Sequence, residues 1–269
     1  MLVPRLIATD LDGTVLRSDG TLSEYTTSVL ERVRAAGSVV VLVTGRPPRR
    51  MGQIIGRIGS EGTAVCANGA VEWDLRTMRA VAEYPLEADV AGEVVDRLRS
   101  RLPDLRFAME YHDHFGYQPG YELGGYDARS RQGIEMPLPD LVAGRGVKLV
   151  ARHPRLPADE LTARTIEIVG DIATPVNTNR RRLVEITAPG VNKASTLARL
   201  CARAGIAPAQ VLAFGDMPND LPMLTWAGTS YAVANAHPQV LAAVAGRARS
   251  NDQDGVAAVL AALFPANGR

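Results

Sequence analysis

The first third of the chain alternates short apolar runs with helical patterns. Residues 6–9 and 39–43 are apolar runs of the kind found in strands buried on both faces of a sheet. Between them, Val29, Leu30 and Val33 recur at the spacing that places apolar side chains on one face of a helix. A further helix and a further strand are expected at residues 54–58 and 63–66. This order predicts a parallel sheet with helical crossovers.

The pattern changes near residue 82, after which the strand-like runs become longer, more polar and more alternating. These runs are residues 105–110, 147–152 and 183–187, and the helical patterns among them are residues 90–98 and 161–169. A stretch rich in Gly, Pro and Tyr predicts an irregular loop over residues 116–146. Together these features predict an α+β layer with a mostly antiparallel sheet half covered by helices.

The α/β pattern then returns. Helical patterns at 192–204, 238–244 and 256–263 alternate with apolar strands at 211–214 and 231–233. The simplest topology is an α/β fold in which an inserted module interrupts a Rossmann-like, parallel-sheet core. We assign residues 1–83 and 186–269 to the core and residues 84–185 to the inserted α+β cap.

Composition narrows the range of partners. The 269 residues carry a formal net charge of +1, so no global field recruits nucleic acid or an anionic membrane. No apolar run approaches the roughly 20 residues needed to span a bilayer, and the N-terminus lacks a signal-peptide pattern. Cys66 and Cys201 are far apart and fit a reducing compartment. We expect a cytoplasmic protein with no nucleic-acid or membrane partner, and the sequence carries no signal for its oligomeric state.

Acidic residues gather where predicted parallel strands end. In an open α/β sheet, ligands bind beyond the carboxyl ends of the strands. Asp10 and Asp12 follow the first strand, and Asp216 and Asp220 follow a late one. Carboxylates crowded into one cleft need a compensating cation, and Mg²⁺ with its preference for oxygen ligands is the natural one.

Residues suited to binding phosphate lie at other element ends. Thr44 offers a hydroxyl, Gly45 lets backbone N–H groups approach a phosphate closely, and Lys193 adds a positive charge at a helix start. The lysine is notable because the chain contains only one other, Lys148. Phosphoryl transfer needs mainly positioning and charge stabilisation, which this set can provide.

These segments resemble the motifs of the haloacid dehalogenase-like (HAD) superfamily, in that family's order. They are Asp10-Leu-Asp-Gly-Thr14, Thr44-Gly-Arg46, Gly190-Val-Asn-Lys193 and Gly215-Asp-Met-Pro-Asn-Asp220. Asn68-Gly69-Ala70 and the late segment Asn251 to Val256 resemble its Cof-type subfamily, whose type IIB cap is inserted between the second and third motifs. The resemblance covers the whole core and the position of the cap.

The resemblance implies a role for each matching residue. Asp10 would be the nucleophile, and Asp12 would protonate the leaving alcohol and then activate water. Asp10, Asp216 and the backbone carbonyl of Asp12 would hold Mg²⁺, while Asn219 and Asp220 would orient that shell or Lys193. The metal-site candidates are therefore Asp10, Asp12, Asp216 and Asp220, and the phosphate-site candidates are Thr44, Gly45, Arg46, Lys193 and Asn219.

The expected function is a Mg²⁺-dependent phosphatase that hydrolyses a small phosphorylated metabolite through an aspartyl phosphate. Sugar phosphates and nucleotide-, flavin- or pyridoxal-type phosphates are all open as substrates, and the cap is expected to act as a selective lid. One alternative is a phosphomutase, which returns the phosphoryl group to a sugar. Another is a non-catalytic protein that binds a phosphometabolite, although binding alone needs no general acid such as Asp12.

Several further residues have two readings. Arg46 could contact substrate or only the surface, Asn68 could sense substrate or shape a turn, and Glu110 could select substrate. The tyrosines 111, 117, 121 and 126 could line a pocket or pack in the core. For the run 180–182, three arginines, we favour a solvated hairpin over an anion site. For His112 and His114 we expect no zinc site, because no nearby ligand set completes one.

Overall fold

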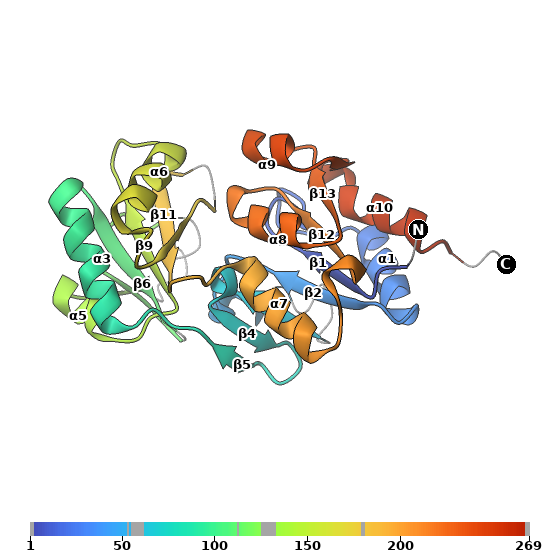
Figure 1. Cartoon of the computed structure of the whole chain (residues 1–269), viewed down its shortest axis with the longest axis horizontal. Coiled ribbons are helices and arrows are strands. Elements are labelled where there is room, and N and C mark those ends of the chain that lie inside the picture. The colour runs from blue at the N-terminus through green and yellow to red at the C-terminus, as the bar shows by residue number, and fades with distance from the viewer. Residues whose placement is uncertain are drawn as a thin grey trace.

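The computed structural model describes residues 3–52, 54, 62–111, 113–124, 133–178 and 181–266. Its first sheet contains β1 (Leu6–Thr9), β2 (Val39–Val43), β3 (Thr63–Cys66), β4 (Val71–Asp74), β5 (Arg79–Glu83), β12 (Val211–Gly215), β13 (Thr229–Val233) and β14 (Gly246–Ala248). Its second sheet contains β6 (Arg106–Glu110), β7 (Phe115–Tyr117), β8 (Gly133–Glu135), β9 (Lys148–Arg152), β10 (Thr174–Val176) and β11 (Leu183–Thr187). The two sheets form two bodies that lie side by side (Figure 1).

The first sheet has the order β14-β13-β12-β1-β2-β3-β4-β5. Strands β14 to β3 are all parallel, and β4 and β5 extend the sheet as an antiparallel hairpin. The helices of this body are α1 (Glu24–Ala35), α7 (Lys193–Arg203), α8 (Leu221–Trp226), α9 (Pro238–Ala243) and α10 (Gly255–Leu263). The predicted α/β class with a parallel-sheet core is therefore confirmed.

The second sheet has the order β10-β11-β9-β6-β7-β8 and is antiparallel except between β7 and β8. Its helices are α3 (Ala88–Arg101), α5 (Leu138–Ala143) and α6 (Ala158–Val169). In Figure 1, α3 and α5 lie on the side of this body away from the first body. The second sheet ends at Thr187, two residues beyond the limit of 185 proposed for the cap, and the exact division of the chain stays a prediction.

Two local predictions differ from the structure. The stretch 116–146 is not irregular throughout, because its described part contains β8, α5 and most of β7. The hairpin formed by β4 and β5 was not predicted at all. The helix expected at 54–58 lies mostly outside the described residues.

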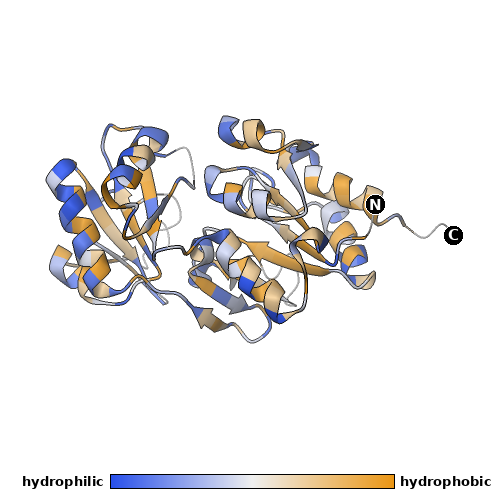
Figure 2. Ribbon diagram, in the orientation of Figure 1, coloured by the Kyte–Doolittle hydropathy of each residue, from blue (hydrophilic) through white to orange (hydrophobic). Residues whose placement is uncertain are grey.

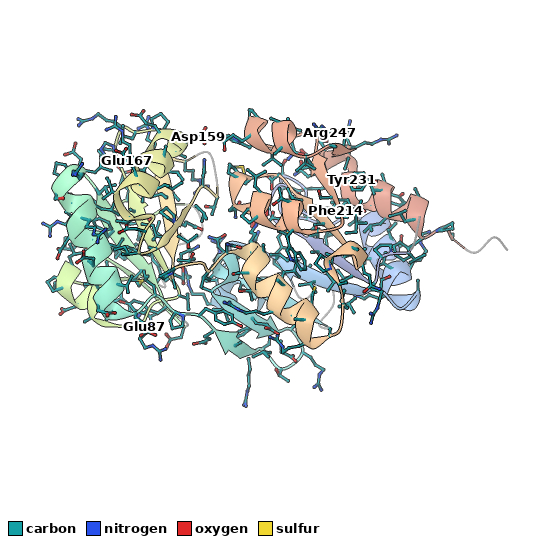
Figure 3. All side chains as sticks on the ribbon, viewed as in Figure 1. Glu87, Asp159, Glu167, Phe214, Tyr231 and Arg247 are labelled. Atoms are coloured by element: carbon teal, nitrogen blue, oxygen red, sulfur yellow. The ribbon has the colours of Figure 1, made fainter. Side chains whose placement is uncertain are left out.

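Apolar side chains hold each body together. Figure 2 shows that the central strands of the first sheet are hydrophobic along much of their length, whereas α3 is hydrophilic on its outer side. Residues Leu6 and Ile7 of β1 are fully buried, as a central parallel strand requires. Figure 3 labels Phe214 and Tyr231 on the neighbouring strands β12 and β13, and their rings stack with centroids 5.6 Å apart. Among the described helices, none has the length and apolar character that crossing a bilayer requires.

Candidate active site

The ends of two adjacent parallel strands bring the first acidic residues together. Asp10 follows β1 and Asp216 follows β12, its parallel neighbour. Gly13 has a φ of +82°, and a Cβ there would lie 2.6 Å from Oδ2 of Asp216, so the two loops meet only because this residue is glycine. Thr14 Oγ1 donates a hydrogen bond of 2.8 Å to Oδ1 of Asp216. The sequence motif alone did not predict this role of Thr14.

A buried lysine clamps the nucleophile candidate. Helix α7 begins at Lys193 because the Asn192 side chain caps it, accepting a 2.9 Å hydrogen bond from the Ser195 backbone N–H. Lys193 Nζ then donates to Oδ1 of Asp10 and to Oδ1 of Asp220, each at 2.6 Å. Its side chain is only 1% exposed. The structure therefore joins the first, third and fourth sequence motifs through one ammonium group.

Asp220 holds the loop that carries Asp216 through hydrogen bonds to its backbone. Its Oδ2 accepts hydrogen bonds of 3.0 Å from the backbone N–H groups of Asp216 and Met217. A Cβ on Gly215 would lie 2.6 Å from the Cβ of Asp220, so glycine allows this close turn. Both oxygens of Asp220 are thus engaged, one by the loop and one by Lys193.

The electrostatics of this cluster are those of buried, crowded carboxylates. Burial raises the pKa of Asp216 to about 7, and the neighbouring Asp220 adds to the shift. Burial also raises the pKa of Asp10 well above its usual range, although Lys193 opposes that shift. Burial would lower the pKa of Lys193, but the charges of Asp10 and Asp220 raise it instead. Lys193 therefore stays charged, and the cluster still carries more negative charge than one ammonium offsets.

This donor set fits a hard divalent cation. Asp10, Asp216 and Asp220 each offer a carboxylate oxygen, and these oxygens all lie within 4.8 Å of one another. Carboxylate oxygen is the ligand type that Mg²⁺ prefers. A dication would also offset the repulsion between carboxylates that, in addition to burial, raises the pKa values of Asp10 and Asp216.

The carboxylate of Asp12 lies apart from the three-carboxylate cluster. It faces Arg46, whose Nε donates to Oδ2 at 2.6 Å and whose Nη2 contacts Oδ1. Asp12 is 56% exposed at its side chain, whereas the Arg46 side chain is 15% exposed. The Asp12 side chain therefore lies outside the group of three carboxylates, and the metal role expected for its backbone carbonyl stays a prediction. Arg46, for which two readings were open, lines the cavity and positions Asp12.

The second motif and the two asparagines form a polar wall. Thr44 Oγ1 accepts a hydrogen bond of 3.1 Å from the Arg46 backbone N–H. Asn219 Nδ2 donates to Oδ1 of Asn68 at 3.0 Å, and a Cβ on Gly45 would lie 3.0 Å from the same oxygen. Asn68 adopts a left-handed φ of 56° that asparagine tolerates. Asn219 therefore holds the side chain of Asn68 in place, and Asn68 lies against Gly45 of the Thr44-Gly-Arg46 motif.

A cavity of about 380 Å³ opens between the two bodies above this cluster. Asp10, Asp12 and Asp216 line it from the first body. The second body contributes Lys148 and Glu185, which form an ion pair of 2.8 Å. Both lysines of the chain thus lie at the site, which is the one signal by which the sequence could have pointed to Lys148.

Contacts across the cavity tie the second body to the first. Lys148 Nζ donates to the Gly45 carbonyl at 2.9 Å, and Asn68 Nδ2 donates to Oε2 of Glu185 at 2.6 Å. Glu110, proposed as a specificity residue, is buried and accepts from Nε of Arg49 at 2.5 Å. These contacts could not be predicted from the sequence pattern, because each joins two segments that lie far apart in the chain.

Of the remaining residues with an open role, some line the cavity and others pack against neighbouring side chains. Tyr121 and Arg181 line the cavity, so Arg181 is not merely part of a solvated hairpin. Tyr111 donates to the Leu141 carbonyl, and Tyr117 packs near the Phe115 ring. His114 contacts Asp113, and the described residues show no His-containing metal cluster. Tyr126, His112 and Arg180 lie outside the described residues.

The parallel sheet, the lysine-clamped acidic cluster at its strand ends and the covered polar cavity together define an α/β enzyme. The sequence profile of the haloacid dehalogenase-like hydrolases matches residues 7–260. The chain belongs to this family.

Relatives and solved structures extend the likeness over nearly the whole chain. A 5-amino-6-(5-phospho-D-ribitylamino)uracil phosphatase of Escherichia coli K12 is 30% identical, covering 95% of this chain and 94% of that protein. An HMP-PP phosphatase of Cronobacter sakazakii is 30% identical over 88% of this chain and 87% of its own length. The structure of SMU.1108c from Streptococcus mutans superposes with a TM-score of 0.86 at 22% identity, covering 98% of this chain and 100% of that one. A HAD subclass IIB sugar phosphatase, BT4131, superposes with a TM-score of 0.79 at 15% identity, covering 95% and 97%.

Proposed function

We propose that this protein hydrolyses the phosphate monoester of a small metabolite, with Asp10 as the nucleophile. The observation that supports this most is the buried Asp10 carboxylate, clamped by Lys193 and facing a cavity that the second body covers. The named relatives are phosphatases of small phosphorylated compounds. A cavity of about 380 Å³ suits a metabolite and not a folded phosphoprotein.

The residues of the site suggest a two-step transfer. In the first step Asp10 attacks phosphorus, the ester oxygen leaves as the alcohol, and an acyl phosphate forms on Asp10. Asp12, two residues on and at the cavity wall, supplies the proton to that oxygen. In the second step Asp12 takes a proton from water, which attacks phosphorus and releases inorganic phosphate. Lys193 and the Thr44–Gly45 segment bind the phosphoryl oxygens.

Asp10 and Asp216 are our candidates for direct Mg²⁺ ligands. Asp220 has both oxygens engaged by Lys193 and the backbone, so we assign it the orienting role. When bound there, Mg²⁺ would neutralise charge that accumulates on the phosphoryl oxygens. The backbone carbonyl of Asp12 stays the further ligand that the family pattern suggests.

Cellular location is also a proposal. Both cysteines are free and buried, and burial raises the pKa of Cys201 to about 11. Unreactive, unpaired thiols suit the reducing cytoplasm in which phosphorylated metabolites are made.

The test is the Asp10→Asn variant, assayed for release of inorganic phosphate from small phosphate esters with Mg²⁺. Turnover should fall below detection, because an amide is a poor nucleophile. The control is Asp171→Asn, which changes an exposed aspartate paired with Arg97 far from the cavity and should keep full activity. EDTA should abolish turnover of the unchanged enzyme. If the Asp10→Asn variant kept a tenth of the activity while folded, Asp10 would not be the nucleophile.

The same assay separates the phosphomutase alternative. A phosphatase releases one inorganic phosphate for each ester consumed, because water accepts the phosphoryl group. A mutase conserves organic phosphate and yields an isomeric ester instead.

A further inference from the structure

Strand β9 presents alternate side chains to the cavity. Lys148, Val150 and Arg152 line the cavity, whereas Leu149 and Ala151 between them are fully buried. A strand rises about 3.3 Å per residue, which separates the Cα atoms of Lys148 and Arg152 by about 13 Å. The side chains of Lys148, Val150 and Arg152 thus form a row along one wall of the cavity, which we call the β9 track. A positively charged residue stands at each of its ends.

The two ends of the track differ in what they adjoin. Lys148 donates to the Gly45 carbonyl, so its end lies at the segment proposed to hold the scissile phosphoryl group. Beyond it the wall is apolar, formed by Val150, Phe115 and Leu183. A substrate that fills the cavity therefore passes from the reaction centre over a hydrophobic stretch to Arg152.

Two guanidinium groups converge at the distant end. A Cβ on Gly124 would lie 3.2 Å from Nη2 of Arg152 and 3.4 Å from Nη1 of Arg181. The Cζ of Arg152 also lies over the Tyr121 ring, 5.7 Å from its centroid. Within the described part of the chain, its buried Nε has no hydrogen-bond partner. An unsatisfied buried donor beside a cavity suits an acceptor that arrives with a ligand.

Among the described residues, the carboxylates near Arg152 leave its charge largely uncompensated. Glu110 is paired with Arg49, and Glu185 is paired with Lys148. Glu122 is 3.8 Å from Arg152, but its side chain is 85% exposed, so solvent screens that interaction. Arg152 thus keeps most of its attraction for an anion in the cavity.

We propose that Arg152 and Arg181 form a second anion-binding subsite, and that the natural substrate is a phosphate monoester with a second anionic group at its far end. That group is a phosphate or a carboxylate, separated from the scissile phosphorus by roughly 10 Å of largely apolar scaffold. Guanidinium forks bind both groups through paired hydrogen bonds. The inference rests on the proposed function: water replaces the ester oxygen at the first phosphorus, and the second anionic group leaves unchanged.

Three synthetic esters of equal length test the subsite in the full-length enzyme with Mg²⁺. They are 6-hydroxyhexyl phosphate, 1,6-hexanediol bisphosphate and 6-(phosphonooxy)hexanoate, and phosphate release gives kcat/KM for each. At least one of the two esters with a second anionic group should exceed the hydroxy ester in kcat/KM by about 10- to 100-fold, the range of a hydrogen bond to a charged group. The value for the bisphosphate is first halved, because its two ends are equivalent. Comparing the bisphosphate with the carboxylate ester distinguishes phosphate from carboxylate recognition.

Arginine variants assign the preference to the proposed residues. Arg152→Gln and Arg181→Gln should each bring the ratio of kcat/KM for the ester with two anionic groups to that for the hydroxy ester close to one. Arg155→Gln, which removes an exposed arginine paired with Asp104 away from the cavity wall, should keep the wild-type ratio. Equal kcat/KM for all three esters in the wild type, or an unchanged ratio in both cavity variants, overturns the subsite while leaving the phosphatase proposal intact. If the wild type releases phosphate from none of the three esters, the phosphatase proposal itself fails.

Discussion

At the scale of single residues, the site depends on small groups beside the reactive ones. Gly13 and Gly215 allow the strand-end loops to meet, and Thr14 then holds Oδ1 of Asp216. None of these contacts involves a proposed catalytic atom. They fix the orientation of a carboxylate that we propose as a metal ligand, and such orienting contacts strengthen metal binding.

Thr14→Val should weaken the use of Mg²⁺. The variant removes the only side-chain hydroxyl that donates to Asp216 among the described residues, and losing such an orienting partner typically costs about 10- to 100-fold in metal affinity. The Mg²⁺ concentration for half-maximal activity should therefore rise by at least about tenfold. Thr14→Ser, which keeps the hydroxyl, is the matched control. An unchanged Mg²⁺ titration curve in the valine variant would show that Thr14 does not position Asp216.

Sequence reasoning predicted the residues that meet at strand ends and missed those that meet across the cavity. Asp10 and Asp216 converge because parallel neighbouring strands end at one edge, a property readable from the order of the motifs. The pairing of Asp12 with Arg46 depends on rotamers within two loops. The hydrogen bonds of Lys148 and Glu185 to the first body depend on how the two sheets face each other. The spacing of apolar residues along the chain cannot specify that arrangement.

At the scale of elements, the starts of α10 and α1 are joined by one side chain. Asp254 precedes α10 with a left-handed φ of 54°. Its carboxylate accepts from Oγ of Ser23 at 2.8 Å and from Oγ1 of Thr26 at 3.2 Å, both at the start of α1. It also pairs with Nη2 of Arg17 at 2.7 Å. One aspartate thus accepts hydrogen bonds from the side chains of three residues.

Asp254→Ala should lower the free energy of unfolding by about 1–3 kcal/mol, after discounting for the partial exposure of Arg17. The change removes the shared acceptor and places alanine at a strained φ. Asp254→Asn should lose less, because asparagine tolerates this φ and keeps one acceptor oxygen. Urea unfolding of the three proteins measures the differences. Equal losses in both variants would mean that only the charge of Asp254 matters.

The pH dependence of this contribution has a defined sign. Burial would raise the pKa of Asp254, but the hydrogen bonds from Arg17 and Ser23 lower it below its usual value of 3.8. A carboxyl group with a lowered folded-state pKa stabilises the fold fully above its unfolded-state pKa. That stabilisation is lost as the pH falls through the folded-state pKa. The stability gap between wild type and the asparagine variant should therefore shrink in acid below about pH 4.

The elements that the sequence did not predict are short or lie at edges. Strands β7 and β8 have three residues each, too few for alternation to be recognised. Helix α5 has six residues and starts beside prolines, so its segment looks like a loop. Strand β5 forms the edge of its sheet and alternates between exposed and half-buried positions without a continuous apolar face. The long, buried strands and the amphipathic helices were predictable because the side chains that face the core must be apolar. That requirement produces a continuous apolar run in a buried strand and a regular apolar spacing in a helix.

At the scale of the whole molecule, the two bodies are held in contact at several separate places. Arg49 and Glu110 form an ion pair with both side chains under 10% exposed, at 6% and 4%. At another edge Nε2 of His237 lies 3.2 Å from Oδ2 of Asp159, and Figure 3 shows Asp159 on the side of the second body that faces the first. These contacts border the cavity, and they would break if the two bodies separated during a catalytic cycle.

The scarcity of lysine makes this opening measurable by covalent labelling. Lys148 and Lys193 carry the only ε-amines of the chain, and their side chains are 4% and 1% exposed. An amine-reactive ester should acylate Lys148 whenever the bodies separate, because its ammonium lies at their boundary. Lys193 sits below it, between two carboxylates, and should react only when the first body itself loosens.

Mass spectrometry of a labelling time course should therefore give two rates, with Lys148 modified first. Equal rates would mean that the bodies separate only when the whole protein unfolds. A ligand that bridges the bodies should slow the reaction of Lys148 and leave the baseline rate of Lys193 unchanged. An almost lysine-free surface would thus turn one buried amine into a reporter of domain motion that needs no engineered probe.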